Sequence, residues 1–441
     1  LQCASGYEGN NPTVTKCTTD GDPYIVSGCT KIPYCVRPSP SDSIGYDFSQ
    51  ITETSLRMDN GFDVTNLQCA SGYEGNNPTV TKCTTDGNPY TISGCTITTA
   101  EWSCARSSNA GTFTRSSDCT ISGECYSECH VIVANTLEIT GSNTDMNNLI
   151  TITAHPSNSR HFYINDINAI LTLRYLKLVG GDVRSASYRY GGSISFLYRG
   201  ELNLHFTILS NNYAKNGGAI EVKGALSLGR VPINMYNCKL SHNVAVGSGG
   251  ALNAARVSMN IVDSEFSNNI ASDSGCCGNG GGILVGSSDG IIRGSTIINN
   301  TALYAGGGIS LHGTNDSPSN ILITETLVKN NKIITTTDTT HGQKDWHGGG
   351  GLSVGRNVNV TLIKISLIDN IADNNHGNEI MTLPNVGDGG WDGTPTISII
   401  NTCFSNPNSN SNFYEYGSGT ATWKTCADNL CKENPLKGIC S

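Results

Sequence analysis

Charged residues are scarce in this chain. Asp, Glu, Lys and Arg make up 14% of its 441 residues and leave a net charge of -9. A nucleic-acid-binding surface needs lysines and arginines gathered against the phosphate backbone, and the sequence has no basic stripe of that kind. We therefore expect no nucleic acid as a partner.

Long apolar runs and helical periodicity are missing as well. No stretch approaches the roughly 18 apolar residues that a membrane-spanning helix needs. Apolar residues do not recur at helical spacing over any long window, and Pro and the 51 glycines interrupt the chain too often for helices. The sequence predicts an all-β protein with no membrane span in this segment.

Cysteine, by contrast, is abundant. The chain has 18 cysteines and no CxxC pairs at the spacing of a zinc ribbon. This usage predicts disulfides in an oxidising compartment, and therefore an extracellular protein without metal or cofactor. Three acceptor triplets for N-linked glycans begin at Asn299, Asn315 and Asn359 and fit that location, although Pro318 weakens the second.

The N-terminal part is a tandem array. Residues 1–30 return as residues 67–96 with three differences, at positions 22/88, 25/91 and 26/92. The first copy begins partway through the repeating unit, so we expect the sequence to be a piece of a longer chain. A full unit spans residues 35–96, where four cysteines and alternating polar and apolar residues predict a small β module with two disulfides. Three pairings of these cysteines are open from spacing alone.

The full unit resembles the sushi (complement control protein) module. Gly72-Tyr73 follows the second cysteine as in that family, and Val80-Thr81-Lys82-Cys83 matches its next strand. Tyr90 stands where the family has a tryptophan. An EGF-like or unrelated disulfide module is the alternative interpretation.

The sushi resemblance also implies which cysteines pair, since the family joins the first to the third and the second to the fourth. Applied to both copies, it implies the disulfides Cys35–Cys83, Cys69–Cys95 and Cys3–Cys29. It leaves Cys17 for a partner that would precede residue 1.

The remaining cysteines allow several arrangements. Cys104, Cys119, Cys125 and Cys129 fall in fewer than thirty residues and are compatible with pairing among themselves. A zinc site that includes His130 is the alternative, but the spacing fits no standard ligand set. Further along, Cys276-Cys277 fits either a vicinal disulfide or a bond to Cys238.

A second kind of repeat dominates the rest of the chain, with two elements that alternate every 26 to 32 residues or so until an insertion at residues 335–347. One element is GG-x-(Ile/Leu), which starts at Gly191, Gly217, Gly249, Gly280, Gly306 and Gly349. The other is apolar-x-x-Asn, with Asn212, Asn243, Asn269, Asn300, Asn330 and Asn370. Self-similarity at this period predicts a solenoid or related repeat fold.

Each period contains roughly three short strands and no helix-length segment, which is typical of a parallel β-helix. The double glycine suits a sharp corner that needs positive φ or close backbone approach. The recurrent asparagine is suited to a ladder of side-chain amides that links successive coils.

The alternating elements resemble the repeats of chlamydial polymorphic outer-membrane proteins and related right-handed, pectin-lyase-like β-helix proteins. The fold class we predict is all-β, a right-handed parallel β-helix preceded by small disulfide-bonded sushi-like modules. We expect half a module at 1–30, a complete module at 35–96, a cysteine-rich junction and cap at 97–130, the β-helix at 131–402, and a cysteine-rich C-terminal cap at 403–441.

Pectin-lyase-like folds include polysaccharide lyases and hydrolases, which need clustered carboxylates or a calcium-binding acidic set. In this chain the acidic residues are scattered. Asp388 and Asp392 lie in a Gly-rich segment that we interpret as a capping turn. We therefore predict no catalytic residues and no enzyme activity.

The leading hypothesis is an extracellular structural protein, the glycosylated repeating subunit of a surface filament or coat, with self-association as its partner interaction. The combination resembles secreted algal or protist surface proteins, such as those of mastigoneme (flagellar-hair) filaments. The alternatives are a monomeric glycan- or receptor-binding adhesin and, behind it, a polysaccharide lyase or hydrolase.

Overall fold

The chain divides into two compact units, unit 1 (Leu1–Ala100) and unit 2 (Glu101–Ser441). Among the described residues the regular structure is β strand, and no helix there is long and apolar enough to cross a membrane. The structure, a computed structural model, describes residues 2–425 except 5, 20–24, 40–41, 44, 60, 71–72, 76, 98–99, 108–109, 123–128, 156–157, 187–188, 199, 226, 228, 273–277, 335–347, 373–376, 383–394, 405–412 and 416–419.

Unit 1 consists of short antiparallel pairs, and the sequence repeat is also a structural repeat. The hairpin β2–β3 in the first copy returns as β10–β11 in the second, and the pair β1–β4 returns as β9–β12. The remaining pairs are β5–β8 and β6–β7. The strands are β1 (Tyr7–Glu8), β2 (Thr13–Thr15), β3 (Ile25–Ser27), β4 (Thr30–Lys31), β5 (Tyr46–Asp47), β6 (Thr52–Ser55), β7 (Asp63–Thr65), β8 (Gln68–Cys69), β9 (Tyr73–Glu74), β10 (Thr79–Thr81), β11 (Thr91–Ser93) and β12 (Thr96–Ile97).

The core of unit 1 is small and covalently braced. Its buried centre consists of Cys35, Cys83 and Tyr90. Partly buried apolar side chains, such as Phe48, Phe62 and Val80, pack against this centre. Tyr90 lies at the position that the sequence resemblance assigns to a tryptophan. Its ring meets Phe62 edge-on at 6.0 Å, and its hydroxyl donates to Glu53 Oε1 at 2.8 Å. Burial together with that hydrogen bond raises the pKa of Tyr90 above its ordinary value.

Side chains hold the short linker, residues 31–34, that joins the half module (1–30) to the complete module (35–96). Lys31 pairs with the carboxylate of Asp86, and the backbone N–H of Tyr34 donates to the same carboxylate at 2.9 Å. Ile32 is buried, and its N–H donates to Gly6 O at 2.9 Å. These contacts restrict the linker beyond what its length imposes.

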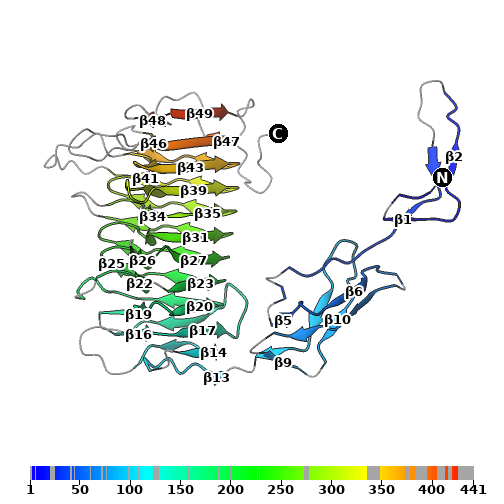
Figure 1. Cartoon of the computed structure of the whole chain (residues 1–441), viewed down its shortest axis with the longest axis horizontal. Helices are drawn as coiled ribbons and strands as arrows, with labels where there is room; N and C mark the ends of the chain where they lie inside the picture. Colours follow the sequence, from blue (N-terminus) through cyan, green and yellow to red (C-terminus); the bar gives the residue numbers. More distant parts are fainter. Residues whose placement is uncertain are drawn as a thin grey trace. The chain divides into compact units, whose positions relative to one another are not determined.

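Unit 2 is a parallel β-helix whose coils stack in sequence order (Figure 1). In the described part of the chain the long strands pair with one another in one sheet and the short strands in a second, and with β13 (Ala100–Glu101) these two connected sheets contain 21 strands. The long strands are β14 (Gly111–Arg115), β17 (Thr136–Gly141), β20 (Ile170–Arg174), β23 (Glu201–His205), β27 (Val231–Tyr236), β31 (Val257–Val262), β35 (Asp289–Arg293), β39 (Ser319–Thr324), β43 (Val358–Ile363), β47 (Thr396–Phe404) and β49 (Thr420–Thr425). The short strands are β15 (Cys119–Thr120), β18 (Ile150–Thr153), β21 (Leu176–Val179), β24 (Ile208–Ser210), β28 (Lys239–Ser241), β32 (Glu265–Ser267), β36 (Thr296–Ile298), β40 (Leu327–Lys329) and β44 (Ser366–Ile368).

Two further sheets complete the coils. The third sheet contains β16 (Cys129–Val133), β19 (Ser159–Ile164), β22 (Ile194–Tyr198), β26 (Ile220–Gly224), β30 (Leu252–Ala255), β34 (Ile283–Gly286), β38 (Ile309–His312), β42 (Leu352–Val354), β46 (Ile380–Thr382) and β48 (Phe413–Glu415). A corner sheet of two-residue strands, which the sequence did not reveal, contains β25 (Tyr213–Ala214), β29 (Val244–Ala245), β33 (Ile270–Ala271), β37 (Thr301–Ala302), β41 (Lys332–Ile333) and β45 (Ile371–Ala372).

Alternation within each strand builds the core of unit 2. Along β27, for example, Val231, Ile233 and Met235 are buried, whereas the residues between them face outward. In-register pairing stacks each inward residue on its equivalent in the next coil, as Ile220 lies on Leu252. Because coils are about 4.8 Å apart, each coil covers the apolar face of its neighbour.

The double glycines form a corner, as predicted. Gly217 has a φ of 59°, in the left-handed region that glycine adopts without strain. Its neighbour Gly218 packs so closely on the next coil that a Cβ there would lie 2.1 Å from Gly250 O. The first glycine therefore serves the turn and the second serves the stacking.

The predicted asparagine ladder is present and buried, with one correction. Each amide nitrogen donates to the Oδ1 of the next ladder residue at 2.9–3.0 Å, and the members are Asn212, Asn243, Asn269, Asn300, Asn331 and Asn370. The sequence pattern placed Asn330 in this row, and that was wrong by one residue. Val328, rather than Leu327, faces the core, and a one-residue shift reverses every side chain of a strand.

Asn330 instead occupies the corner before the ladder. The residue that precedes each ladder asparagine has a φ of 54–57°. Asn and Asp tolerate this left-handed conformation better than most residues, which explains the Asn-Asn pairs in the sequence.

The parallel ladder extends into both segments predicted as caps. β14 pairs with β17 in parallel register ahead of residue 131, and β47 pairs with β49 beyond residue 402. In β14, Phe113 pairs in register with Ile139 of the next coil and packs on the core.

Candidate functional surface

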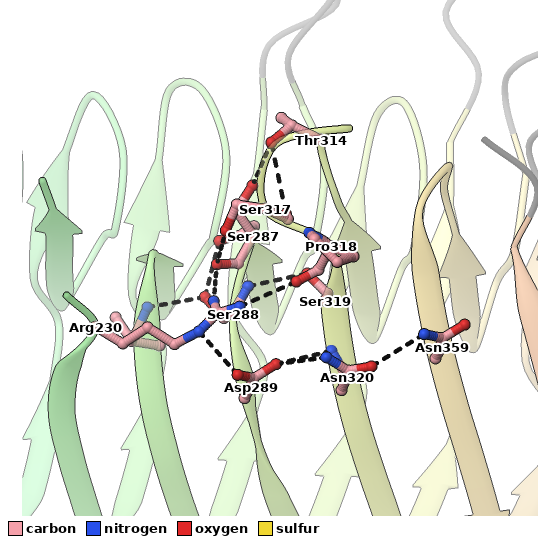
Figure 2. A network of polar contacts seen from close by, with 12 residues as sticks. Arg230, Ser287, Ser288, Asp289, Thr314, Ser317, Pro318, Ser319, Asn320 and Asn359 are labelled. Carbon is pink, nitrogen blue, oxygen red and sulfur yellow. Dashed lines mark hydrogen bonds and ion pairs between the residues drawn. The ribbon is translucent and has the colours of Figure 1, made fainter. Parts of the chain in front are cut away.

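Arg230 reaches along the outside of unit 2, across coils that are not neighbours (Figure 2). It precedes β27, and its Nε lies 2.8 Å from Asp289 Oδ2 on β35, two coils on. Its Nη2 donates to Pro318 O at 3.1 Å, and its Nη1 donates to Ser287 O. The planar guanidinium can serve all three acceptors at once because its donors point in fixed directions.

The contact to Asp289 continues as an exposed ladder. Asp289 Oδ1 accepts hydrogen bonds from Asn320 N at 3.2 Å and from Asn320 Nδ2 at 2.9 Å. Asn320 Oδ1 in turn accepts from Asn359 Nδ2 at 3.0 Å, as Figure 2 shows. With Arg230, this network spans the coils from β27 to β43 along one line of the surface.

Several hydroxyl groups lie beside this network, and two of them belong to the turn between β38 and β39. Thr314 and Ser317 exchange two backbone hydrogen bonds of 3.1 Å, and Ser317 Oγ donates to Ser287 O at 3.3 Å. Ser288 Oγ donates to Gly286 O at 2.8 Å. These serines fix backbone geometry, and no histidine or carboxylate in the network is placed to activate them as nucleophiles.

The sequence analysis missed this network, although the chain carries a signal for it. Asp289, Asn320 and Asn359 are separated by 31 and 39 residues. The buried ladder residues Asn300, Asn331 and Asn370 have the same separations. A search for polar residues that share the spacing of the known ladder would have found the exposed one.

A second polar area lies on the long-strand sheet nearer the N-terminal end of the β-helix. Asn234 Nδ2 donates to Asn203 Oδ1 at 2.9 Å, and Asn260 Nδ2 donates to the Tyr236 hydroxyl at 2.8 Å. The rings of His205 and Tyr236 stack at 5.1 Å. Burial, with a smaller contribution from nearby Arg174, lowers the pKa of His205 to about 4, so the ring is neutral at physiological pH.

Several titratable side chains are buried elsewhere in unit 2. Both ring nitrogens of His161 are engaged, Nε2 with Ile152 O and Nδ1 with Ser193 Oγ, each at 3.0 Å, and burial lowers its pKa to about 4. Burial raises the pKa of Glu221 to about 8. In the part of the chain that the structure describes, no three His, Cys, Asp or Glu side chains come together as a metal site would require.

The structure places the predicted site cysteines in pairs. The disulfides in unit 1 are Cys3–Cys29, Cys35–Cys83 and Cys69–Cys95, the pairs that the sushi resemblance implies. In unit 2, Cys104 is bonded to Cys119. Cys17 and Cys238 are free thiols among the described residues, and burial raises the pKa of Cys238 to about 12.

Other residues that the sequence analysis considered lie outside the described residues. They are Cys125, Cys276, Cys277, Asp388, Asp392, and Cys426, Cys431 and Cys440 in the C-terminal segment. The pairing of these cysteines with one another stays a prediction. The alternative of a bond from Cys276 or Cys277 to Cys238 is not formed in the structure, where Cys238 is a free thiol.

The three glycosylation triplets fall in three different settings. Asn359 belongs to the exposed ladder, and Asn315 Oδ1 accepts a hydrogen bond from Asn357 Nδ2 at 2.7 Å. Asn299 is exposed at a corner, and its side chain makes no hydrogen bond to any described residue.

No known protein family and no curated protein matches the chain. Among solved structures, a mannuronic-acid-specific polysaccharide lyase of family 6 from human gut microbiota covers 69% of this chain and 77% of its own length. The identity is 9% and the TM-score 0.16, a likeness that carries no argument about fold or activity.

Proposed function

We propose that this chain is an extracellular structural protein, the repeating subunit of a surface filament or coat, with sushi-type modules next to a β-helix rod. The observation that carries the proposal is the direction of its polar contacts. On the described coils, carboxamides and hydroxyls bond to neighbouring coils along the axis, and Arg230 bonds to coils further along it, instead of converging on one point.

Hydrogen bonds between coils stabilise an elongated stack, but they do not assemble a catalytic site. A catalytic site holds an acid, a base and a charge-stabilising group around one reacting atom. In the exposed network the charged groups Arg230 and Asp289 neutralise each other, and the amides of Asn320 and Asn359 bond to their neighbours. We infer that the chain is not an enzyme.

Electron microscopy of the purified chain over a range of concentrations tests the structural role. We expect fibres or two-dimensional arrays, with a matching rise in sedimentation coefficient. The same sample under reducing conditions tests the contribution of the described disulfides, three of which lie in unit 1 and one, Cys104–Cys119, in unit 2. Particles that stay monodisperse and monomeric at high concentration would rule out the filament.

The second candidate function is a monomeric glycan- or receptor-binding adhesin. The area formed by Asn203, Asn234, Asn260, His205 and Tyr236 favours it, because carboxamides beside aromatic rings match the hydroxyls and apolar faces of sugars. Binding of the chain to a glycan array, lost in Asn234→Ala and kept in Asn320→Ala, would support this function over assembly.

Catalysis is tested separately with a panel of acidic polysaccharides. We expect no release of unsaturated or reducing sugars above the background of a heat-treated sample. Turnover that disappears in Asp388→Asn or Asp392→Asn would establish a lyase or hydrolase and overturn the non-enzymatic assignment.

A further inference from the structure

The three acceptor triplets are equivalent as sequence, but their positions in the fold are not. Asn299 lies at the corner between β36 and β37, Asn315 in the turn between β38 and β39, and Asn359 within β43. All three side chains are exposed. Exposure alone therefore does not decide which of them carries a glycan.

Asn359 lies in the middle of a sheet face. Asn320 and Thr396 are its partners in register on the two adjoining coils, about 4.8 Å away on either side. Its amide nitrogen is the atom to which an N-linked sugar would be attached, and this atom donates to Asn320 Oδ1. A sugar ring there has to stand over both neighbours and disturb the last step of the ladder from Arg230 (Figure 2).

Asn315 lies in a turn that its own triplet holds together. Ser317, the hydroxyl residue of the triplet, donates to Ser287 O, and Pro318 follows it directly with a carbonyl bonded to Arg230. The Oδ1 of Asn315 is occupied by Asn357. The triplet is thus a structural part of the network in Figure 2.

Asn299 also has neighbours on the two adjoining coils, Asn268 and Asn330, but its side chain bonds to neither of them. Its φ of 57° places it on the convex corner that precedes the buried ladder, with its side chain directed outward and unbonded to any described residue. Thr301, the hydroxyl residue of the triplet, lies half-buried on β37. A glycan on Asn299 displaces no contact of the described coils.

We propose that Asn299 is the residue of unit 2 that carries an N-linked oligosaccharide, and that Asn315 and Asn359 remain unmodified members of the polar network. The inference rests on the proposed secretion of the chain. It also limits assembly, because a glycan at Asn299 covers the corner next to β37. Subunits in a filament then meet through other faces.

Secretion of the chain from a eukaryotic cell, followed by peptide-N-glycosidase treatment in heavy-oxygen water and mass spectrometry, tests the assignment. Thr301→Ala, Ser317→Ala and Thr361→Ala each remove one triplet and leave its asparagine in place. We expect one glycan to be lost in Thr301→Ala and none in the other two variants. Asn299→Gly, which keeps the left-handed backbone, is expected to lose the same glycan.

A glycan lost in Thr361→Ala or Ser317→Ala, or an unlabelled Asn299 in the secreted wild-type chain, overturns the assignment. Electron microscopy of the same secreted material separates this from the proposed function. Fibres with an unmodified Asn299 contradict only the glycan assignment, whereas a glycan at Asn299 on a monomer contradicts only the filament.

Discussion

The two units are held together by different means. The buried centre of unit 1 is three side chains, and two of them are the halves of the Cys35–Cys83 disulfide. The core of unit 2 runs without interruption from Trp102 to Ile399, coil upon coil. A small module buries too little apolar surface to be stable alone and needs covalent bonds, whereas each coil of a solenoid gains stability from its neighbours.

Removal of the Cys35–Cys83 disulfide should produce the largest difference in stability between the two units. Replacing both Cys35 and Cys83 by serine opens a loop whose ends are 48 residues apart, which is expected to cost about 4 kcal/mol and to unfold the module. Limited proteolysis should then cleave unit 1 rapidly. Tryptophan fluorescence should show no change in unit 2, because all four tryptophans lie there.

Cys17→Ser is the matched control, since Cys17 is a free thiol in the structure. It should leave the proteolysis pattern unchanged. A fall in the unfolding midpoint of unit 2 in the double variant would show that the two units are coupled, and the contrast drawn here would fail.

The next largest effect is expected from the buried ladder. Asn269→Ala removes the acceptor of two donors, the N–H and Nδ2 of Asn243, and leaves Leu240 O without its partner. Buried unsatisfied groups of this kind should lower the free energy of unfolding of unit 2 by about 3 kcal/mol in urea titrations.

Asn268→Gly tests whether burial, and not asparagine itself, is responsible. Asn268 precedes Asn269, is exposed, and has a φ of 56° that glycine also adopts. Its substitution should change stability by less than about 0.5 kcal/mol. Equal losses in the two variants would mean that the ladder is not the stabilising feature.

The stability of the two units should also depend differently on pH. Unit 1 has no histidine, whereas in unit 2 burial lowers the pKa of His161, His205 and His312 to about 4 and that of His130 to about 3. Because the folded pKa lies below the ordinary 6.5, the unfolded chain binds protons first. The contribution of these histidines to stability is therefore complete above pH 6.5 and falls as the pH drops toward 4, by about 1.4 kcal/mol per pH unit for each fully buried histidine. Glu221, whose pKa burial raises to about 8, contributes with the opposite sign over this range.

Urea titrations of unit 2 between pH 7 and pH 4 measure this slope. His161→Asn should reduce it by one histidine's share. His242→Asn is the matched control for the substitution itself, because His242 is exposed at a corner whose positive φ asparagine accepts. A slope that is the same in all three proteins would contradict the burial argument.

The sequence predicted the parts of the fold that depend on single residues. Double glycines mark a corner because the first adopts a φ near 66°, as at Gly280, and the second lies against the backbone of the next coil, as Gly281 does against Gly307. The sushi resemblance likewise implied three disulfides, because cysteine spacing survives changes in the residues between. Two elements that alternate at a fixed period, with short strands and no helix-length segment between them, were sufficient to predict the parallel β-helix.

What the sequence did not predict depends on register between coils. Asn330 and Asn331 are the same residue type, so only the direction of Val328 decides which one joins the ladder. The pair Arg230 and Asp289 is 59 positions apart and meets only because the intervening turns bring β27 and β35 into line. Short-range patterns carry no information about such alignments.

The smallest predicted effect concerns that pair. Arg230→Met keeps the aliphatic part of the side chain and removes its contacts to Asp289, Ser287 and Pro318. The side chains of Arg230 and Asp289 are 25% and 43% exposed, so solvent weakens the ion pair and the expected loss is about 1 kcal/mol. Arg293→Met, at the opposite end of β35 from Asp289, should cost less than about 0.5 kcal/mol. A larger loss in Arg230→Met than in Arg293→Met would show that axial contacts stabilise the surface of the rod as they do its core. Equal losses in the two variants would mean that only the buried asparagine ladder, and not the surface network, stabilises unit 2 through contacts between coils.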